Sequence, residues 1–177
     1  MKALIVIDVQ QGLFEPEPQP ANAAQVIARI NTLTAKARQR GVPVVFIQHE
    51  ATVGQHFRHG SDAWQLHVGL EVLAGDQFVR KTTPDSFLNT DLDALLKHAG
   101  VSELVVCGYA TEFCIDTTVR RAAGLGYHVT LASDAHTTHD KAHAEAAAII
   151  AHHNATLPSI KSFGVQISAQ PSAEVSF

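Results

Sequence analysis

The sequence predicts an α/β fold in which helices cover both faces of a parallel sheet. Two observations lead to this prediction. Short apolar runs alternate along the 177 residues with segments of helical spacing, which is the pattern of βαβ units. The apolar runs are also continuous, as in strands that are buried on both faces. Because the chain has no internal repeats and no linker-like stretch, we expect a single domain over residues 1–177.

The first half of the chain supplies two long strands and one long helix. Residues 3–8 (ALIVID) form an apolar run that ends in a carboxylate, and residues 42–48 (VPVVFIQ) form a second run. Between them, residues 23–41 repeat apolar side chains at helical spacing, and the Gly at the end of this segment suits a helix stop. Residues 49–76 are rich in His, Gly and Asp, and we expect them to be irregular.

The second half continues the alternation. We expect strands at residues 77–81, 103–108, 128–133 and 156–161. We expect helices at residues 89–100, 113–125 and 139–153. The residues after Phe163 show no clear pattern.

Composition and charge exclude several classes of protein. Hydrophobic residues make up 46% of the chain and charged residues 17%, which is ordinary for a globular protein. The formal net charge is −4 and no block of Lys or Arg stands out, so binding to nucleic acid or to an anionic membrane has no electrostatic support. No apolar run approaches the roughly 18 residues of a membrane span. The N-terminus reaches an Asp too early for a signal peptide, and two cysteines make no disulfide framework, so we expect a cytoplasmic protein.

Reactive side chains follow three of the expected strands. In parallel sheets, ligands bind beyond the carboxyl ends of the strands. Asp8 ends the first strand, Lys81 ends the third, and Cys114 comes shortly after the fourth. We therefore expect an acid, a cation and a thiol to converge at one edge of the sheet. Cys107 lies inside an apolar strand and is assigned to the core.

Cys114 stands where a helix is expected to begin. A thiol in the first turn of a helix feels the positive end of the helix dipole, which favours the thiolate and therefore nucleophilicity. Gly108 lets the chain turn off the strand, and the same turn offers backbone N–H groups that suit an oxyanion. A buried structural cysteine is the alternative. A nucleophile, a base, a cation and oxyanion donors are together the parts of acyl transfer through a thioester.

Four segments of the chain resemble the isochorismatase-like cysteine hydrolases, the superfamily of nicotinamidases and N-carbamoylsarcosine amidohydrolase. The segments are LIVIDVQ (4–10), RKTTPDSF (80–87), GYATEFCIDTT (108–118) and SDAHTT (133–138). They occur in the family's order and at its spacing, and the resemblance runs from about residue 2 to about residue 155. It implies a three-layer, Rossmann-like α/β/α sandwich with a mostly parallel six-stranded sheet.

The resemblance also implies a role for each reactive residue. Asp8 is expected to be the general base, Lys81 to stabilise the ionised pair and to fix the substrate, and Cys114 to attack the carbonyl carbon. The backbone N–H groups of Ala110 and Cys114 are expected to form the oxyanion hole, beside a cis peptide bond between Tyr109 and Ala110. The implied activity is hydrolysis of a small amide or a related C–N bond, with no cofactor.

The substrate pocket is expected beside these residues. Thr111 and Thr118 are expected to stabilise the loop and the helix. Among the aromatic candidates Trp64 is the strongest, because it lies in a polar segment, whereas core packing is the alternative for the others. The candidates are Gln10, Phe14, His49, Phe57, Trp64, Phe87 and Tyr109.

Two other functions stay open. The first is a zinc-dependent nicotinamidase, which in this family supplies an Asp-x-His pair after the second strand. Here that position reads Ile47-Gln48-His49-Glu50, without the Asp, so we predict a metal-free site. The other is a catalytically idle or thiol-based binding protein on the same fold.

Further histidines are spaced so that they are candidates for metal ligands. His56, His59 and His67 follow the second strand, and His139 and His143 are spaced to share a helical face. We assign His139 and His143 to the solvated face of a helix rather than to a metal site.

The resemblance implies a homo-oligomer, either a dimer or a tetramer. The apolar tail 164–168 (GVQIS) is a candidate for burial at an interface, and a disordered tail is the alternative.

Overall fold

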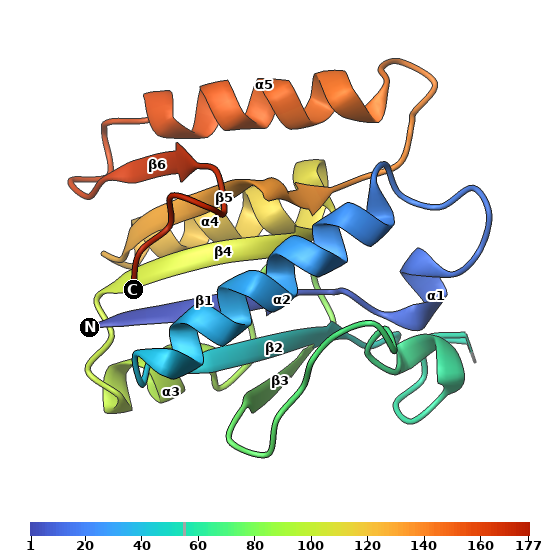
Figure 1. The fold of residues 1–177 in the computed structure, drawn as a ribbon, viewed down its shortest axis with the longest axis horizontal. Helices are drawn as coiled ribbons and strands as arrows, with labels where there is room; N and C mark the ends of the chain where they lie inside the picture. The colour runs from blue at the N-terminus through green and yellow to red at the C-terminus, as the bar shows by residue number, and fades with distance from the viewer. Residues whose placement is uncertain (55) are drawn as a thin grey trace.

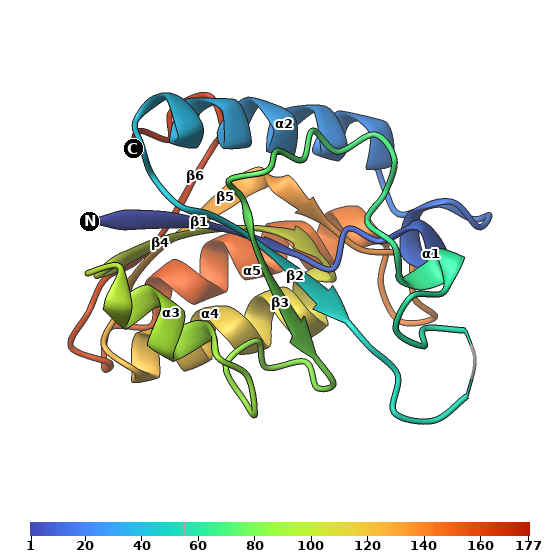
Figure 2. The same cartoon turned by 90° about the horizontal axis from the view of Figure 1, so that it is seen from below.

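Six parallel strands form one sheet at the centre of the protein, and helices cover both of its faces (Figures 1 and 2). The structure is a computed structural model that describes residues 1–54 and 56–177. The strand order is β3-β2-β1-β4-β5-β6, and all five strand pairs are parallel. The expected α/β sandwich is therefore confirmed, with a sheet that is wholly parallel.

The strands are short and most of their residues are buried. Their bounds are β1 (Lys2–Ile7), β2 (Val44–His49), β3 (Gln77–Lys81), β4 (Glu103–Tyr109), β5 (His128–Thr137) and β6 (Ile167–Gln170). Successive side chains of a strand point to opposite faces of a sheet. Because both faces are covered, the buried positions of β1, which are all those after Lys2, are apolar, and this explains the continuous apolar run.

The helices divide unequally between the two faces. Their bounds are α1 (Gln11–Phe14), α2 (Ala23–Gln39), α3 (Leu92–His98), α4 (Asp116–Gly124) and α5 (Ala146–Ser159), with a 3₁₀ turn at Asp62–Trp64 and a π turn at Thr111–Ile115. The long helix α2 covers one face, while α3, α4 and α5 cover the other (Figure 2). Within the described residues, no helix has the length and apolar character needed to cross a membrane.

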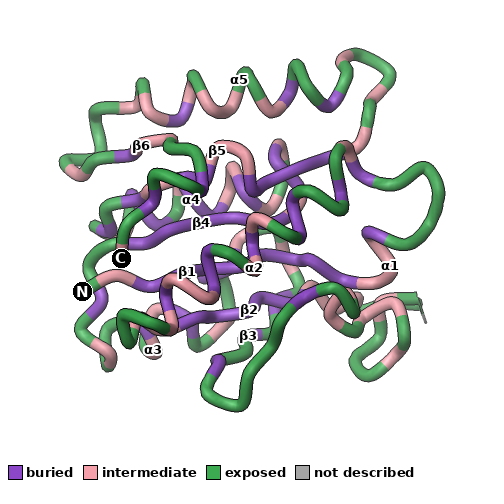
Figure 3. The backbone as a smooth tube through the Cα atoms, in the orientation of Figure 1, coloured by how far each residue is buried: buried purple, intermediate pink, exposed green. Residues whose placement is uncertain are grey.

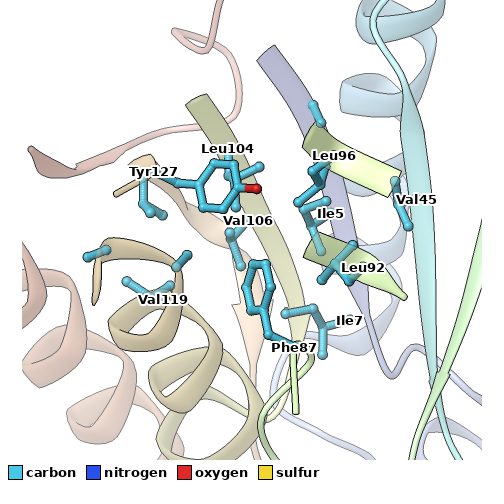
Figure 4. Packing of buried hydrophobic residues seen from close by; sticks show 14 of the residues in the cluster. Ile5, Ile7, Val45, Phe87, Leu92, Leu96, Leu104, Val106, Val119 and Tyr127 are labelled. Atoms are coloured by element: carbon cyan, nitrogen blue, oxygen red, sulfur yellow. The ribbon is translucent and has the colours of Figure 1, made fainter. Parts of the chain in front are cut away.

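Each face of the sheet has its own hydrophobic core. On the face of α3, α4 and α5, Ile5 and Ile7 of β1 pack with Leu92, Leu96 and Val119 (Figure 4). On the face of α2, the alternate residues of β1 pack against the helix. The buried strands form the centre of the molecule, between largely exposed outer helix faces (Figure 3).

The last third of the chain differs from the sequence prediction in two places. The helix expected at 139–153 begins only at Ala146, whose N–H is accepted by the side chain of Asp140, while β5 continues to Thr137. The strand expected at 156–161 is wrong, because these residues mostly belong to the last turns of α5. Pro158 lies inside that helix, and such a residue reads in sequence as a helix stop.

The tail also departs from expectation. Residues 167–170 form β6, which pairs with β5 along the edge of the sheet, and Ile167 is buried opposite Val129. The segment 164–168 was expected either at an interface between subunits or disordered. The disordered alternative is wrong for residues 167–170, and Ile167 completes the core of its own chain, while an interface along this segment stays a prediction.

Candidate active site

The side chains predicted to be reactive meet where the strand order changes direction. Strands β2 and β3 lie in turn on one side of β1, and strands β5 and β6 lie in turn on the opposite side of β4. The loops that leave β1 and β4 therefore diverge, and the carboxyl ends of these strands flank the crevice that binds ligands in such sheets. Asp8, Lys81 and Cys114 lie at this edge and contact one another.

Asp8 directly follows β1 and is almost completely buried, with 1% of its surface exposed. Its backbone N–H donates to Ile47 O over 2.9 Å, which continues the pairing with β2 by one step. Its backbone then turns into the left-handed region, with φ of 52°. Asp adopts this conformation more readily than most residues, and non-glycine residues held in it are concentrated at functional sites.

Lys81 is the last residue of β3 and is also 1% exposed. Its Nζ donates to Asp8 Oδ2 over 2.6 Å, to Thr83 O over 3.1 Å and to Cys114 Sγ over 3.2 Å. An ammonium has three N–H donors, so each of them has a protein acceptor. Strand β2 lies between β3 and β1, and the long side chain of Lys81 reaches across its end. The expected role of Lys81 in fixing the substrate stays a prediction.

Burial and the neighbouring groups act in opposite directions on Lys81. Burial opposes its charge, but the Asp8 carboxylate and the Cys114 sulfur outweigh burial, and the pKa of Lys81 is raised. The side chain is therefore a buried cation, held between an acid and a thiol.

The surroundings of Cys114 favour the protonated thiol over the thiolate that its place in the sequence suggests. Burial, followed by the charge of Asp8, raises the pKa of Cys114 to about 12, although Lys81 acts to lower it. Cys114 lies in the five-residue π turn, which runs directly into α4 at Asp116, so it is near the start of a continuous helical segment as expected, but burial and Asp8 dominate its pKa. A thiolate at Cys114 therefore requires transfer of the thiol proton to another group.

Asp8 has an oxygen that is free to take this proton. Its Oδ2 is bound by Lys81, whereas its Oδ1 is buried and has no hydrogen-bond partner among the described residues. A buried carboxylate oxygen without a donor is costly, so it is suited to accept a proton from a thiol, a substrate or a water molecule.

The turn that carries Cys114 depends on a glycine. Gly108 has a φ of 119°, and a Cβ at this position would collide with the backbone of Ile7 in the neighbouring strand. The peptide bond between Tyr109 and Ala110, shortly after Gly108, is cis. Ala110 O accepts from the N–H groups of Phe113 and Ile115, each over 3.1 Å, whereas the Ala110 N–H has no acceptor within the described part of the chain.

Two of the expected pocket residues lie near the cluster. His49 ends β2, and burial together with the charge of Lys81 lowers its pKa, against the opposing effect of Asp8. Its Nδ1 is buried and unpaired among the residues described. Burial, Glu112, Cys114 and Asp8 raise the pKa of Tyr109 to about 12, and its hydroxyl pairs with His139 Nδ1 at 2.8 Å.

Gln10 serves the backbone. Its amide bonds both N–H and C=O of His49, and it donates to Trp64 O over 2.7 Å. It therefore fastens β2 to the 62–64 turn and has no free polar group to orient Asp8 or a substrate.

The aromatic candidates separate into core and loop residues. Phe87 stacks on Tyr127 in the core, and Phe14 is buried between the rings of His67 and Tyr109. We expected both rings to line the substrate pocket, but both are buried in the core. The other two lie on the irregular segment. Trp64 lines a surface cavity of about 620 Å³ that contains none of Asp8, Lys81 and Cys114, and Phe57 packs against His56.

The threonines behave as expected. Thr111 Oγ1 pairs with His136 Nδ1 at 2.8 Å, and Thr118 Oγ1 pairs with Ser86 Oγ at 2.8 Å, so both stabilise the loop and the helix. Two residues at the site were not predicted: Thr83, whose carbonyl accepts from Lys81, and His136, the partner of Thr111. His136 lies within one of the family-like segments.

The histidines do not form a metal site. Within residues 1–54 and 56–177, no group of three or more His, Cys, Asp or Glu side chains is placed to hold a metal ion. His139 and His143 precede α5 and share no helical face, since the helix starts after them. The residues present therefore do not fit the zinc site of a metal-dependent nicotinamidase.

Known proteins resemble this chain in sequence. The family model described as the isochorismatase domain matches residues 2–162. A streptothricin hydrolase of Streptomyces noursei is 40% identical over 140 residues, which are 79% of this chain and 51% of that protein. The chain thus spans about half the length of this relative. The ureidoacrylate amidohydrolase RutB of Pseudomonas syringae pv. syringae is 28% identical, over 75% of this chain and 69% of that protein.

Known structures resemble it as well. The crystal structure of an isochorismatase family protein matches with a TM-score of 0.87 and 37% sequence identity, over 96% of this chain and 97% of that one.

Proposed function

This chain belongs to the isochorismatase family, and from that premise we propose that it is a cysteine-dependent hydrolase of a small amide or a related C–N bond. The observation that carries the proposal is the position of the Lys81 ammonium, which donates both to the Asp8 carboxylate and to the Cys114 sulfur. Two relatives with hydrolase names support the class of reaction. Acid, cation and thiol are the parts that acyl transfer through a thioester needs.

The first half of the reaction forms the thioester. As Sγ of Cys114 adds to the carbonyl carbon, its proton passes to Asp8 Oδ1 and the carbonyl electron pair moves onto oxygen. Lys81 stabilises the carboxylate before the transfer and the sulfur during it. When the oxyanion collapses, the C–N bond breaks and the leaving nitrogen takes the proton from Asp8. It departs as ammonia or an amine.

The second half releases the acid. A water molecule gives a proton to Asp8 as its oxygen adds to the thioester carbon. Collapse of this intermediate breaks the C–S bond, and the sulfur of Cys114 recovers the proton from Asp8. The products are a carboxylic acid, or the related acid of a carbamoyl substrate, and the original thiol.

We propose that two backbone N–H groups of the turn that carries Cys114 hold the oxyanion. The Ala110 N–H, which has no acceptor within the described part of the chain, is one proposed donor, and the Cys114 N–H is the other. Donors that are already oriented toward developing charge lower the barrier without reorganisation, and each is worth roughly a hundredfold or more in rate.

A panel of simple amides tests the proposal, with ammonia release as the readout. Nicotinamide belongs in the panel. We expect turnover of at least one amide by the wild-type protein, and a loss of more than about a thousandfold in both Cys114→Ser and Cys114→Ala. Cys107→Ser is the matched control, because Cys107 is fully buried in β4 and takes no part. Full activity of both Cys114 variants would disprove the mechanism, and an inert wild-type protein would favour the binding protein.

A further inference from the structure

A chain of three side chains connects the nucleophile turn to the last helix. Thr111 Oγ1 lies 2.8 Å from His136 Nδ1, and His136 Nε2 lies 3.0 Å from Asn154 Oδ1. Asn154 in turn donates from Nδ2 to Ser133 O over 2.9 Å. The three residues come from the π turn, from β5 and from α5, so the chain joins elements that are distant in sequence.

The hydrogen bonds that link Thr111, His136 and Asn154 can be made in only one direction. Because Asn154 Nδ2 donates to Ser133 O, its Oδ1 faces His136 and can only accept. His136 Nε2 must therefore carry a proton, and in a neutral imidazole the other nitrogen is then an acceptor. The hydroxyl of Thr111 is consequently the donor to Nδ1.

Burial keeps His136 in this neutral form. The residue is 1% exposed, and Thr111 is fully buried. Burial lowers the pKa of His136 to about 4, and His153 on α5 acts in the same direction, whereas Asn154 and the Asp134 carboxylate on β5 oppose it. At neutral pH the imidazole is an uncharged link with one fixed donor and one fixed acceptor.

His136 binds the turn that carries Cys114 at its first residue, where it can fix the position of Cys114. Thr111 is the first residue of the π turn, and Cys114 lies three residues later in the same turn. His136 is paired in register with Gly108, where β4 meets β5 after an irregularity in the ladder. The turn is therefore held from two sides, by the pairing of β4 and by the hydroxyl of Thr111.

We propose that His136 is a positioning residue that, fixed by Asn154, anchors Thr111 and so holds Cys114 against Asp8 and Lys81. The proposal rests on the proposed function, in which Cys114 is the nucleophile. A displacement of about 1 Å in a reacting group costs as much as a hundredfold in rate. The anchor thus acts on the reaction through the turn, without touching the substrate.

The alkylation rate of Cys114 tests the anchor without any substrate. The probe is iodoacetamide at pH 9, with modification followed by intact mass; Cys107 is fully buried. In the anchored turn the raised pKa of Cys114 makes the thiolate scarce, so alkylation is slow. Thr111→Val keeps the shape but removes the donor. We expect it to release Cys114 toward an ordinary thiol and to speed alkylation at least about tenfold, since each unit of pKa changes the thiolate tenfold.

Two further variants separate positioning from general stability. Thr111→Ser retains a hydroxyl and is expected to restore the slow rate. Thr34→Val removes a hydroxyl that is just as buried, in α2, and is expected to alkylate like the wild type. Urea unfolding confirms that each variant is folded. A Thr111→Val rate within about threefold of wild type, or slower, overturns the proposal.

The imidazole tautomer gives a measurement on the unaltered protein. In ¹⁵N NMR at pH 7, His136 is expected to carry its proton on Nε2, and a proton on Nδ1 overturns the proposal even if Thr111→Val fails to fold. The proposed function fails separately, if Cys114→Ser keeps its amide turnover.

Discussion

Burial and charge act in opposite directions on the side chains of the candidate active site. Burial raises the pKa of Cys114 and opposes the charge of Lys81, while the contacts with Asp8 and Cys114 keep the lysine charged. The protein thus holds a buried ion pair beside a neutral thiol. In the proposed reaction the proton stays on sulfur until a carbonyl group binds, and it then passes to Asp8.

His136 makes the stability of the fold sensitive to acid. The unfolded chain takes up a proton on this residue near pH 6.5, whereas the folded protein does so only near pH 4. Between these values the unfolded state binds more protons, so the free energy of unfolding falls as pH is lowered. The contribution is complete above about pH 6.5 and is lost by pH 4, and its size is about 3 kcal/mol at most.

The measurement compares urea unfolding of the wild type and His136→Gln between pH 7 and pH 4. The wild type is expected to lose more of its unfolding free energy over this interval, because Gln does not titrate. Equal losses in the two proteins would contradict the account. If the variant does not fold, an NMR titration of the wild type replaces it, and protonation of His136 above pH 6 is the contradicting result.

At the scale of single residues, the sequence predicted where the reactive side chains lie better than it predicted how their surroundings affect their protonation. Asp8 and Lys81 end strands, and parallel strands bring their carboxyl ends to one edge, so their meeting with Cys114 followed from the pattern. The protonated state of Cys114 did not follow, since burial by distant elements has no local signature. The pairing of His136 with Asn154, 18 residues away, likewise depends on how α5 packs.

At the scale of elements, the approach of β4 to β1 constrains the turn that carries Cys114. Gly108 is paired with Ile7 in register, and its backbone conformation is one that side chains rarely adopt. The turn leaves the sheet immediately after this point. The close contact between the two strands therefore determines where the turn begins.

Gly108→Ala is expected to lower the free energy of unfolding by more than about 3 kcal/mol, because the new Cβ collides with the Ile7 backbone and the left-handed conformation adds strain. Urea unfolding measures the loss. Gly75→Ala is the matched control, with nothing within 4 Å of the added Cβ, and should change the value by less than about 0.5 kcal/mol. A similar, small change in both variants would show that the strands can separate at Gly108.

The elements predicted best were those with long apolar signals. The strands at β1, β2 and β4 and the helix α2 were expected almost where they lie. The start of α5 and the strand β6 were not. The alanine-rich segment offers no clear start, and the cap from Asp140 comes from six residues upstream. β6 has four residues and buries little more than Ile167, so its strand identity comes from the sheet edge that it joins.

At the scale of the whole molecule, the strand order determines where chemistry takes place. Only the pair β1 and β4 has loops that leave in opposite directions, and the proposed base and nucleophile follow these two strands. Lys81 comes from outside the pair, on β3, and reaches in across β2. The proposed catalytic residues thus belong to three strands that only the finished sheet brings together.

Detection of the thioester tests the central claim most directly. An amide that the protein hydrolyses is mixed with the wild type, the reaction is quenched with acid during turnover, and the peptide that contains Cys114 is weighed by mass spectrometry. The account predicts an added mass equal to the acyl group, located on Cys114, and no such mass in Cys114→Ser. Continued turnover by Cys114→Ser, with no adduct on the wild-type peptide, would contradict it.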